Sequence, residues 1–187
     1  FQVFVFSSLY EENYYNNNNV KYFKIPIKRK VNIFFDLITL AILVFYFYKF
    51  KICFVHSIMP KSGLLSNLAA FFLGIPLRIH TFTGQVWVNQ SFIKRYILKL
   101  IDKIISILCT NVLCDSLSQR RYLIDHGIVK KDKIDCISKG SIIGVNLHKF
   151  KFDKISKEKI RKENNIPIES FVYIFVGRIN KDKGIYD

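Results

Sequence analysis

The pattern of apolar and polar residues along the chain changes its period repeatedly. Short apolar runs alternate with longer segments in which apolar residues recur every three or four positions. The short runs are typical of buried strands, and the longer spacing is typical of helices that pack through one face. The short runs predict strands or extended segments at 1–6, 20–27, 51–56, 77–82, 111–114, 134–138 and 171–176. The longer segments predict helices at 31–48, 62–73, 92–108, 116–126 and 154–165.

Strands that alternate with helices in this way predict an α/β fold with a parallel sheet and flanking helices. Such sheets bind ligands in the crevice beyond the carboxyl ends of their strands. The residues that follow the predicted strands are therefore the first candidates for a functional site. They include His56, Thr83-Gly84, Asp115-Ser116, Lys139-Gly140-Ser141 and Gly177-Arg178.

Segment 31–48 is long and apolar and carries a single charged residue, Asp36. A segment of this length is also long enough to insert into a membrane. We favour a crossover helix, because Asp36 lies near the start of the segment, where a carboxylate stabilises a helix N-terminus. Membrane insertion stays open as the alternative.

Segment 92–108 is the clearest amphipathic helix, because its apolar residues keep helical spacing throughout. With the preceding Trp87, its basic face is a candidate contact for an anionic membrane or a polyprenyl diphosphate. The alternative is an ordinary helix with a packed apolar face and a solvated basic face. The basic residues are Lys94, Arg95, Lys99 and Lys103.

Composition narrows the class of protein without identifying it. Of 187 residues, 50% are hydrophobic, which excludes intrinsic disorder. A net charge of +15 indicates an anionic partner, although a coding bias toward Lys and Asn explains part of it. Four cysteines without a Cys-x-x-Cys pair predict buried free thiols in a reducing compartment. The sequence contains no zinc signature, Walker loop or readable Ser/His/Asp triad.

The most specific motif follows the predicted strand 171–176. Gly177 and Arg178 come directly after that strand, and Lys183 and Gly184 come where a helix would begin. Glycine lets the backbone approach a ligand, and two cations beside a helix N-terminus suit a diphosphate. A solvated turn after a strand is the alternative interpretation.

This motif resembles the glycosyltransferases of family 4, which have the GT-B fold of two facing Rossmann-like domains. Three other segments resemble the family in the expected order, namely 55–63, 78–84 and 139–146 followed by Phe150. The resemblance implies that Arg178 and Lys183 are catalytic, bind the diphosphate of a nucleotide-sugar and stabilise the departing phosphate without a metal or cofactor. It also implies donor contacts by Gly177, Gly144 and Val145. Asn146 stands where the family usually has Asp.

The resemblance further implies an acceptor pocket formed by His56, His80, Thr83 and Gly84. One departure concerns Thr83, because many members of the family have His at this place, near the reacting sugar. His80 lies three positions earlier, which is an odd offset along a strand and puts the two side chains on opposite faces. His80 is therefore either close to the pocket or a core residue.

The resemblance also predicts the domain organisation. Residues 1–145 would form a Rossmann-like acceptor-binding domain that lacks its first strand, the N-terminal half of a GT-B architecture. Residues 146–167 would form an interdomain linker and helix, and residues 168–187 the start of the donor domain. Because the chain opens within an apolar run and stops after another, we expect an internal fragment that does not catalyse transfer alone.

The expected function is that of a retaining glycosyltransferase, a hexosyltransferase in cell-surface polysaccharide or glycoconjugate synthesis. Its partners would be a nucleotide-sugar, a lipid-linked or glycan acceptor and an anionic membrane surface, at the cytoplasmic side of the cell membrane. One alternative is a basic nucleic-acid-binding module, but the cations are scattered and no aromatic-basic motif appears, so we expect no nucleic acid partner. Another alternative is a non-catalytic membrane-surface protein anchored by 31–48.

Overall fold

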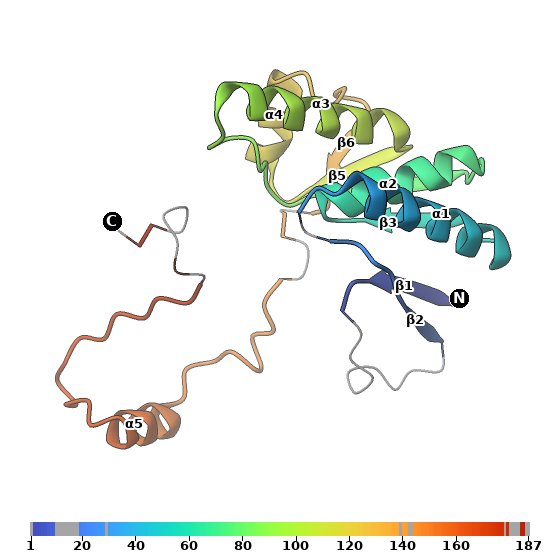
Figure 1. Ribbon diagram of the computed structural model, residues 1–187. Coiled ribbons are helices and arrows are strands. Elements are labelled where there is room, and N and C mark those ends of the chain that lie inside the picture. The colour runs from blue at the N-terminus through green and yellow to red at the C-terminus, as the bar shows by residue number, and fades with distance from the viewer. Residues whose placement is uncertain are drawn as a thin grey trace. The chain divides into compact units, whose positions relative to one another are not determined.

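The computed structural model describes residues 2–9, 19–28, 30–138, 140–141, 144–177, 179 and 184–185. The chain divides into two compact units, Phe1–Ile143 and Gly144–Asp187 (Figure 1). The strands are β1 Val3–Ser7, β2 Val20–Lys24, β3 Phe54–Ser57, β4 Leu77–Phe82, β5 Asn111–Cys114 and β6 Ile134–Cys136. The helices are α1 Ile33–Lys49, α2 Pro60–Phe72, α3 Phe92–Leu108, α4 Leu117–Asp125 and α5 Lys154–Glu163, of which α5 lies in the second unit.

The first unit contains a four-stranded parallel sheet in the order β3-β4-β5-β6. Helices α2, α3 and α4 connect consecutive strands of this sheet, as parallel pairing requires. Strands β1 and β2 form a separate parallel pair. The predicted α/β fold with a parallel sheet is therefore confirmed. Within the described residues, β1 pairs only with β2 and β3 only with β4, and the absent first strand stays a prediction.

Two apolar clusters hold the first unit together. One lies under α3 and α4 and includes Phe82, Ile105, Val112 and Leu123. The other joins α1, α2 and β3. On β5 and β6, alternate side chains such as Val112 and Ile134 point into the first cluster, as the two-residue period of a strand requires. Of the four cysteines only Cys53 is exposed, so the expectation of buried thiols is correct for the other three.

Segment 31–48 contains a helix whose ends follow local chemistry. The Asn32 side chain caps α1 by accepting a hydrogen bond from the Phe35 amide at 3.1 Å. Asp36 lies in the first turn and forms an ion pair with Lys61 of α2 at 2.6 Å. Helix α1 packs against α2 and connects β2 to β3, which belong to different sheets in the described residues, so the crossover helix within one sheet stays a prediction. Among the described helices, none combines the length and the hydropathy that a bilayer crossing requires.

Segment 171–176 differs from its prediction, because it forms no strand. Phe171, Tyr173 and Val176 are largely exposed to solvent. A strand is stable when a neighbouring strand pairs with its backbone groups, and the described residues of Gly144–Asp187 include no other strand. Apolar character alone therefore did not produce a buried strand here.

A buried polar network connects β3, β4 and α2. The Ser57 hydroxyl lies 2.8 Å from Nδ1 of His80, and the Asn67 amide donates to the same hydroxyl at 2.9 Å. Gly63 of α2 makes room for the imidazole, since a Cβ at this position would lie 2.5 Å from Cε1 of His80. The network fixes His80 in the core of the unit.

Gly63→Ala should lower the free energy of unfolding by about 2 kcal/mol, because the added methyl group overpacks the His80 ring. Urea titration followed by circular dichroism measures the change. In a His80→Ala background the clash is gone, and the same substitution should stabilise by up to about 1 kcal/mol through helix propensity. An equal effect in both backgrounds would contradict the packing argument.

Candidate functional site

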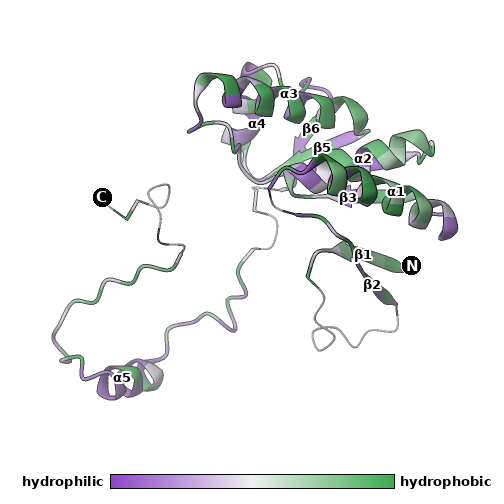
Figure 2. Ribbon diagram, viewed as in Figure 1, coloured by the Kyte–Doolittle hydropathy of each residue, from purple (hydrophilic) through white to green (hydrophobic). Residues whose placement is uncertain are grey.

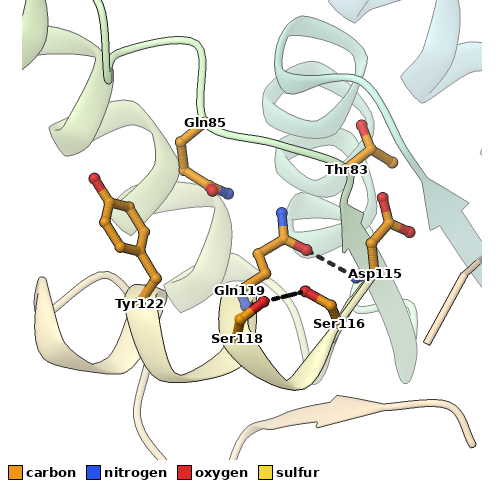
Figure 3. Close-up of a pocket in the computed structure, with 7 residues that line it drawn as sticks. All are labelled: Thr83, Gln85, Asp115, Ser116, Ser118, Gln119 and Tyr122. Carbon is orange, nitrogen blue, oxygen red and sulfur yellow. Dashed lines mark hydrogen bonds between the residues drawn. The ribbon is translucent and has the colours of Figure 1, made fainter. Parts of the chain in front are cut away.

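A pocket of about 420 Å³ opens where β4 and β5 end (Figure 3). Thr83 follows β4 and Asp115 follows β5, and the last paired residues of these strands are Phe82 and Cys114. Parallel neighbours bring their carboxyl ends to one edge of the sheet, which is the usual place for ligands. The lining residues are Thr83, Gln85, Asp115, Ser116, Ser118, Gln119 and Tyr122.

The start of α4 gives the pocket one firm wall. The Ser116 hydroxyl caps the helix by accepting from the Gln119 amide at 3.1 Å. The Gln119 side chain in turn accepts from the Asp115 amide at 2.8 Å. The first bond is the N-cap half of the capping box that Ser116 and Gln119 predict, whereas the Gln119 side chain accepts from the residue before the N-cap instead of from Ser116. The bond between the Gln119 side chain and the Asp115 backbone connects the start of α4 to the end of β5 (Figure 3).

The segment after β6 contacts the backbone carbonyl of Asp115 through Gly140 and Ser141. The Ser141 amide donates to the Asp115 carbonyl at 2.7 Å. Gly140 has φ of 103°, and a Cβ there would lie 2.3 Å from the same carbonyl oxygen. Glycine is required at this approach because a side chain would meet backbone that cannot move aside. This explains the Gly-Ser pair among the predicted strand-end residues.

Two lining residues have polar atoms that are buried without a hydrogen-bond partner, namely Oδ1 of Asp115 and Nε2 of Gln85. The first can accept a hydrogen bond and the second can donate one. Unsatisfied buried polar groups are costly, and a ligand that pairs with both would relieve the cost. Asp115 is also the only residue of the lining that carries a formal charge. The pocket therefore suits a neutral, hydroxyl-rich ligand better than a phosphate.

Tyr122 forms another part of the lining and is backed by Trp87. The Trp87 ring stacks on Tyr122 with 5.6 Å between ring centroids, and its Nε1 donates to Oδ2 of Asp102 on α3 at 2.8 Å. Trp87 is fully buried, so the expectation that it meets a membrane is wrong. Burial raises the pKa of Asp102 to about 6, although the Trp87 hydrogen bond acts in the opposite direction.

The four residues expected in the acceptor pocket separate in the structure. Thr83 lines the pocket, and Gly84 follows it with φ of 143°. His56 lies outside the lining, and its Nε2 is 2.8 Å from the Thr81 hydroxyl. His80 is a core residue whose pKa is lowered to about 4, mainly by burial and further by nearby His56. Neither histidine is among the lining residues.

Sequence reasoning missed four lining residues. Ser118 and Gln119 follow from the capping box, which places the first turn of α4 at the end of β5. Gln85 and Tyr122 had no such signal, because the fold of the chain after β4 brings them to the pocket.

The residues expected to contact the donor lie in the second unit. Gly144 has φ of 70°, Val145 is exposed, and a Cβ on Gly177 would lie 3.4 Å from the Phe175 ring. Arg178 and Lys183 lie outside the described residues.

Asn146 accepts from the amides of His148 at 3.0 Å and Lys149 at 3.1 Å. Its side chain thus provides the acceptor oxygen that Asp would provide in this turn. In the described part of the chain, no three His, Cys, Asp or Glu side chains group as a metal site would require.

Comparison with known proteins finds relatives by sequence and by structure, although no family model matches the chain. The chain is 34% identical, over 87% of its length, to the capsular polysaccharide biosynthesis glycosyltransferase CapM of Staphylococcus aureus. It is 28% identical, over 88% of its length, to the UDP-Gal:alpha-D-GlcNAc-diphosphoundecaprenol alpha-1,3-galactosyltransferase of Escherichia coli. It spans 42% of the length of each of these relatives.

Two solved structures resemble the chain at low sequence identity. A glycosyltransferase from Rickettsia africae matches 80% of this chain and 37% of its own, with a TM-score of 0.54 and 19% identity. HepE from Anabaena, solved in complex with UDP, matches 78% of this chain and 36% of its own, with a TM-score of 0.51 and 12% identity. The chain is thus related by sequence to part of two glycosyltransferases, and its fold is the Rossmann-like α/β fold.

Proposed function

We propose that this chain belongs to a retaining glycosyltransferase of family 4 with the GT-B fold. At the length of its relatives, the protein would transfer a sugar from a nucleotide-sugar to a lipid-linked or glycan acceptor in cell-surface polysaccharide synthesis. The sequence similarity to CapM and to a galactosyltransferase with a diphosphoundecaprenol acceptor supports this assignment. The chain alone, which spans 42% of those relatives, would not complete the reaction.

The observation that carries the proposal is the pocket at the ends of β4 and β5. Its buried Asp115 oxygen and Gln85 nitrogen offer one acceptor and one donor to a sugar, with Thr83 and Ser118 hydroxyls beside them. The Asp115 carboxylate would repel a diphosphate. We therefore assign the acceptor sugar to this pocket and 1–145 to acceptor binding.

The donor would bind mainly through the second unit and the domain beyond it. Gly144 and Gly177 would let the backbone approach the nucleotide-sugar, and the exposed Val145 would contact it. Arg178 and Lys183 would bind its diphosphate and stabilise the negative charge that develops as the sugar leaves. Because these cations neutralise the leaving group, the reaction would need no metal and no cofactor other than the donor substrate.

Asp115→Asn in the protein at the length of its relatives tests the acceptor assignment. The change removes a charged acceptor of hydrogen bonds but keeps the side-chain shape, so KM for the acceptor should rise about 10- to 100-fold. KM for the nucleotide-sugar should stay unchanged. Steady-state kinetics with each substrate varied in turn measures both values.

Asp125→Asn is the matched control, because Asp125 lies exposed at the far end of α4, the helix that follows Asp115, and outside the pocket. It removes the same charge and should change neither KM. A rise in the donor KM of Asp115→Asn with the acceptor KM unaltered would reverse the assignment of the pocket. Absence of sugar transfer by the wild-type protein across a panel of nucleotide-sugars would overturn the proposed activity itself.

We further propose a cytoplasmic location at the inner face of the cell membrane, in contact with its anionic surface. The lipid-linked acceptor in the name of the Escherichia coli relative supports it. The surface of α3 supports it independently.

A further inference from the structure

Helix α3 is packed in an unusual orientation, because its outward side is largely apolar. Its buried positions are Asp102, Ile105, Ser106 and Leu108. The apolar residues on the outward side form what we call the α3 stripe, namely Phe92, Ile93, Tyr96, Ile97, Leu100, Ile104 and Ile107. Two polar side chains therefore face the core while seven apolar side chains face solvent. Figure 2 shows the green of hydrophobic residues along this helix.

The α3 stripe is continuous from the first turn of the helix to the last. Phe92 is 87% exposed, Tyr96 67% and Ile107 65%. Their spacing of three or four residues places the members of the stripe side by side on one face. Single exposed apolar residues need no explanation, but a contiguous patch of this kind marks a surface that binds something.

The charged residues of α3 indicate a partner with negative charge. Lys99 and Lys103 belong to the same row of the helix as Phe92 and Tyr96, since each follows at a spacing of three or four residues. Lys94 and Arg95 add two exposed cations at the first turn, of which Arg95 lies over the buried Trp87 ring, as the half-buried Lys99 does, at 5.8 Å and 5.2 Å from its centroid. The one acidic residue of α3, Asp102, is buried. The outward side therefore combines an apolar stripe with cations and carries no exposed carboxylate.

We infer that the α3 stripe lies in the surface of an anionic lipid bilayer, with the helix parallel to the membrane plane. The apolar side chains would enter the boundary between headgroups and acyl chains, and the lysines would contact lipid phosphates. A second copy of this chain fits less well, because two such helices face to face would bring like cations of both copies together without an exposed carboxylate of α3 to oppose them.

The inner side of the same helix leads to the pocket. Asp102 of α3 binds Trp87, and Trp87 stacks on Tyr122 of the pocket lining. A bilayer under α3 would thus lie one helix away from the proposed acceptor pocket, where a lipid-linked acceptor presents its sugar. This consequence rests on the proposed function, whereas binding to the bilayer does not.

Flotation of the full chain with vesicles tests the inference. The chain should float with vesicles of phosphatidylcholine and phosphatidylglycerol and stay behind with phosphatidylcholine alone. Leu100→Glu combined with Ile104→Glu should reduce the floated fraction at least about 10-fold, because two carboxylates cannot enter the acyl boundary. The matched control is Ile155→Glu combined with Ile160→Glu, two exposed apolar positions of α5, which should float like the wild type.

Lys99→Gln combined with Lys103→Gln should weaken binding to anionic vesicles several-fold. Lys130→Gln combined with Lys131→Gln removes the same charge from an exposed loop and should leave binding unchanged. Far-UV circular dichroism and thermal unfolding confirm that each variant folds.

A fluorescent reporter tests the orientation of the helix. The tryptophan introduced by Tyr96→Trp should be quenched by brominated lipids, whereas the native Trp87, fully buried behind α3, should be quenched weakly.

Flotation that survives the double glutamate change in α3, or that is lost instead with Leu37→Glu on the exposed side of α1, would overturn the inference. Self-association in solution that is lost with the α3 change would also overturn it. If this chain floats with anionic vesicles but the protein at the length of its relatives transfers no sugar, only the proposed function is overturned.

Discussion

Arg178→Ala and Lys183→Ala, each made in the protein at the length of its relatives, should lower kcat by about 100- to 1000-fold with a nucleotide-sugar donor. Both cations would lie beside the diphosphate of the donor. Negative charge on this group grows as the bond to the sugar breaks, so a cation there stabilises the transition state more than the bound substrate. The loss should therefore appear mainly in kcat, with a smaller change in the donor KM.

Two further variants sharpen this prediction. Arg178→Lys keeps the charge but removes the paired donors of the guanidinium, so it should recover only part of the activity. Lys181→Ala removes a cation from the same short segment, between the two proposed catalytic residues, and should have little effect. Near-normal turnover of both alanine variants at Arg178 and Lys183 would disprove the diphosphate site. Equal losses for Lys181→Ala and Lys183→Ala would indicate general attraction of anions instead of a specific contact.

The second large effect concerns the stability of the first unit at acidic pH. His80 has a pKa of about 4 in the folded chain, against 6.5 for an unperturbed histidine. Between these values the unfolded state binds a proton that the folded state does not. Neutral His80 therefore contributes fully to the free energy of unfolding above pH 6.5, and this contribution is lost as the pH falls to about 4. The loss amounts to about 3 kcal/mol.

Asp102 acts in the opposite direction over nearly the same pH range. Its pKa is about 6 in the folded chain, against 3.8 for an unperturbed aspartate, so the folded state binds the proton first. Asp102 contributes fully to the free energy of unfolding below pH 3.8. This contribution, also about 3 kcal/mol, is lost as the pH rises through about 6. The two contributions nearly cancel in the wild type.

Single substitutions should reveal each contribution. Asp102→Asn keeps an acceptor for the Trp87 indole but does not titrate, so its free energy of unfolding should fall by about 3 kcal/mol more than that of the wild type from pH 7 to pH 4. His80→Gln should change the pH dependence in the opposite direction by a similar amount. Urea denaturation at a series of pH values measures both. Parallel pH profiles for the wild type and the two variants would show that neither group is buried in the way described.

Local signals determined the secondary structure of the first unit well. The helix 92–108 and the strand 111–114 have the predicted bounds, and α4 begins at the predicted capping box. These features depend on residues that lie within a few positions of one another, so the sequence contains the whole physical cause. The expectation that ligands bind at the carboxyl ends of parallel strands drew attention to Thr83 and Asp115, and both residues line the pocket.

Which face of an element is buried was decided only by the tertiary structure. The periodicity of α3 predicts an apolar face toward the core, yet Asp102 faces inward because the indole of Trp87, fifteen residues away, supplies its hydrogen bond. Segment 171–176 is apolar enough for a strand but has no strand to pair with in the described residues of its unit.

The pocket depends on the tertiary structure in the same way, because Gln85 and Tyr122 reach it from separate segments. The sequence by itself determined the elements and the parallel α/β fold, since helix periodicity, caps and strand alternation are local. The buried partners of charged and aromatic side chains were decided by tertiary contacts, because burial and hydrogen bonding join residues that are distant in the chain.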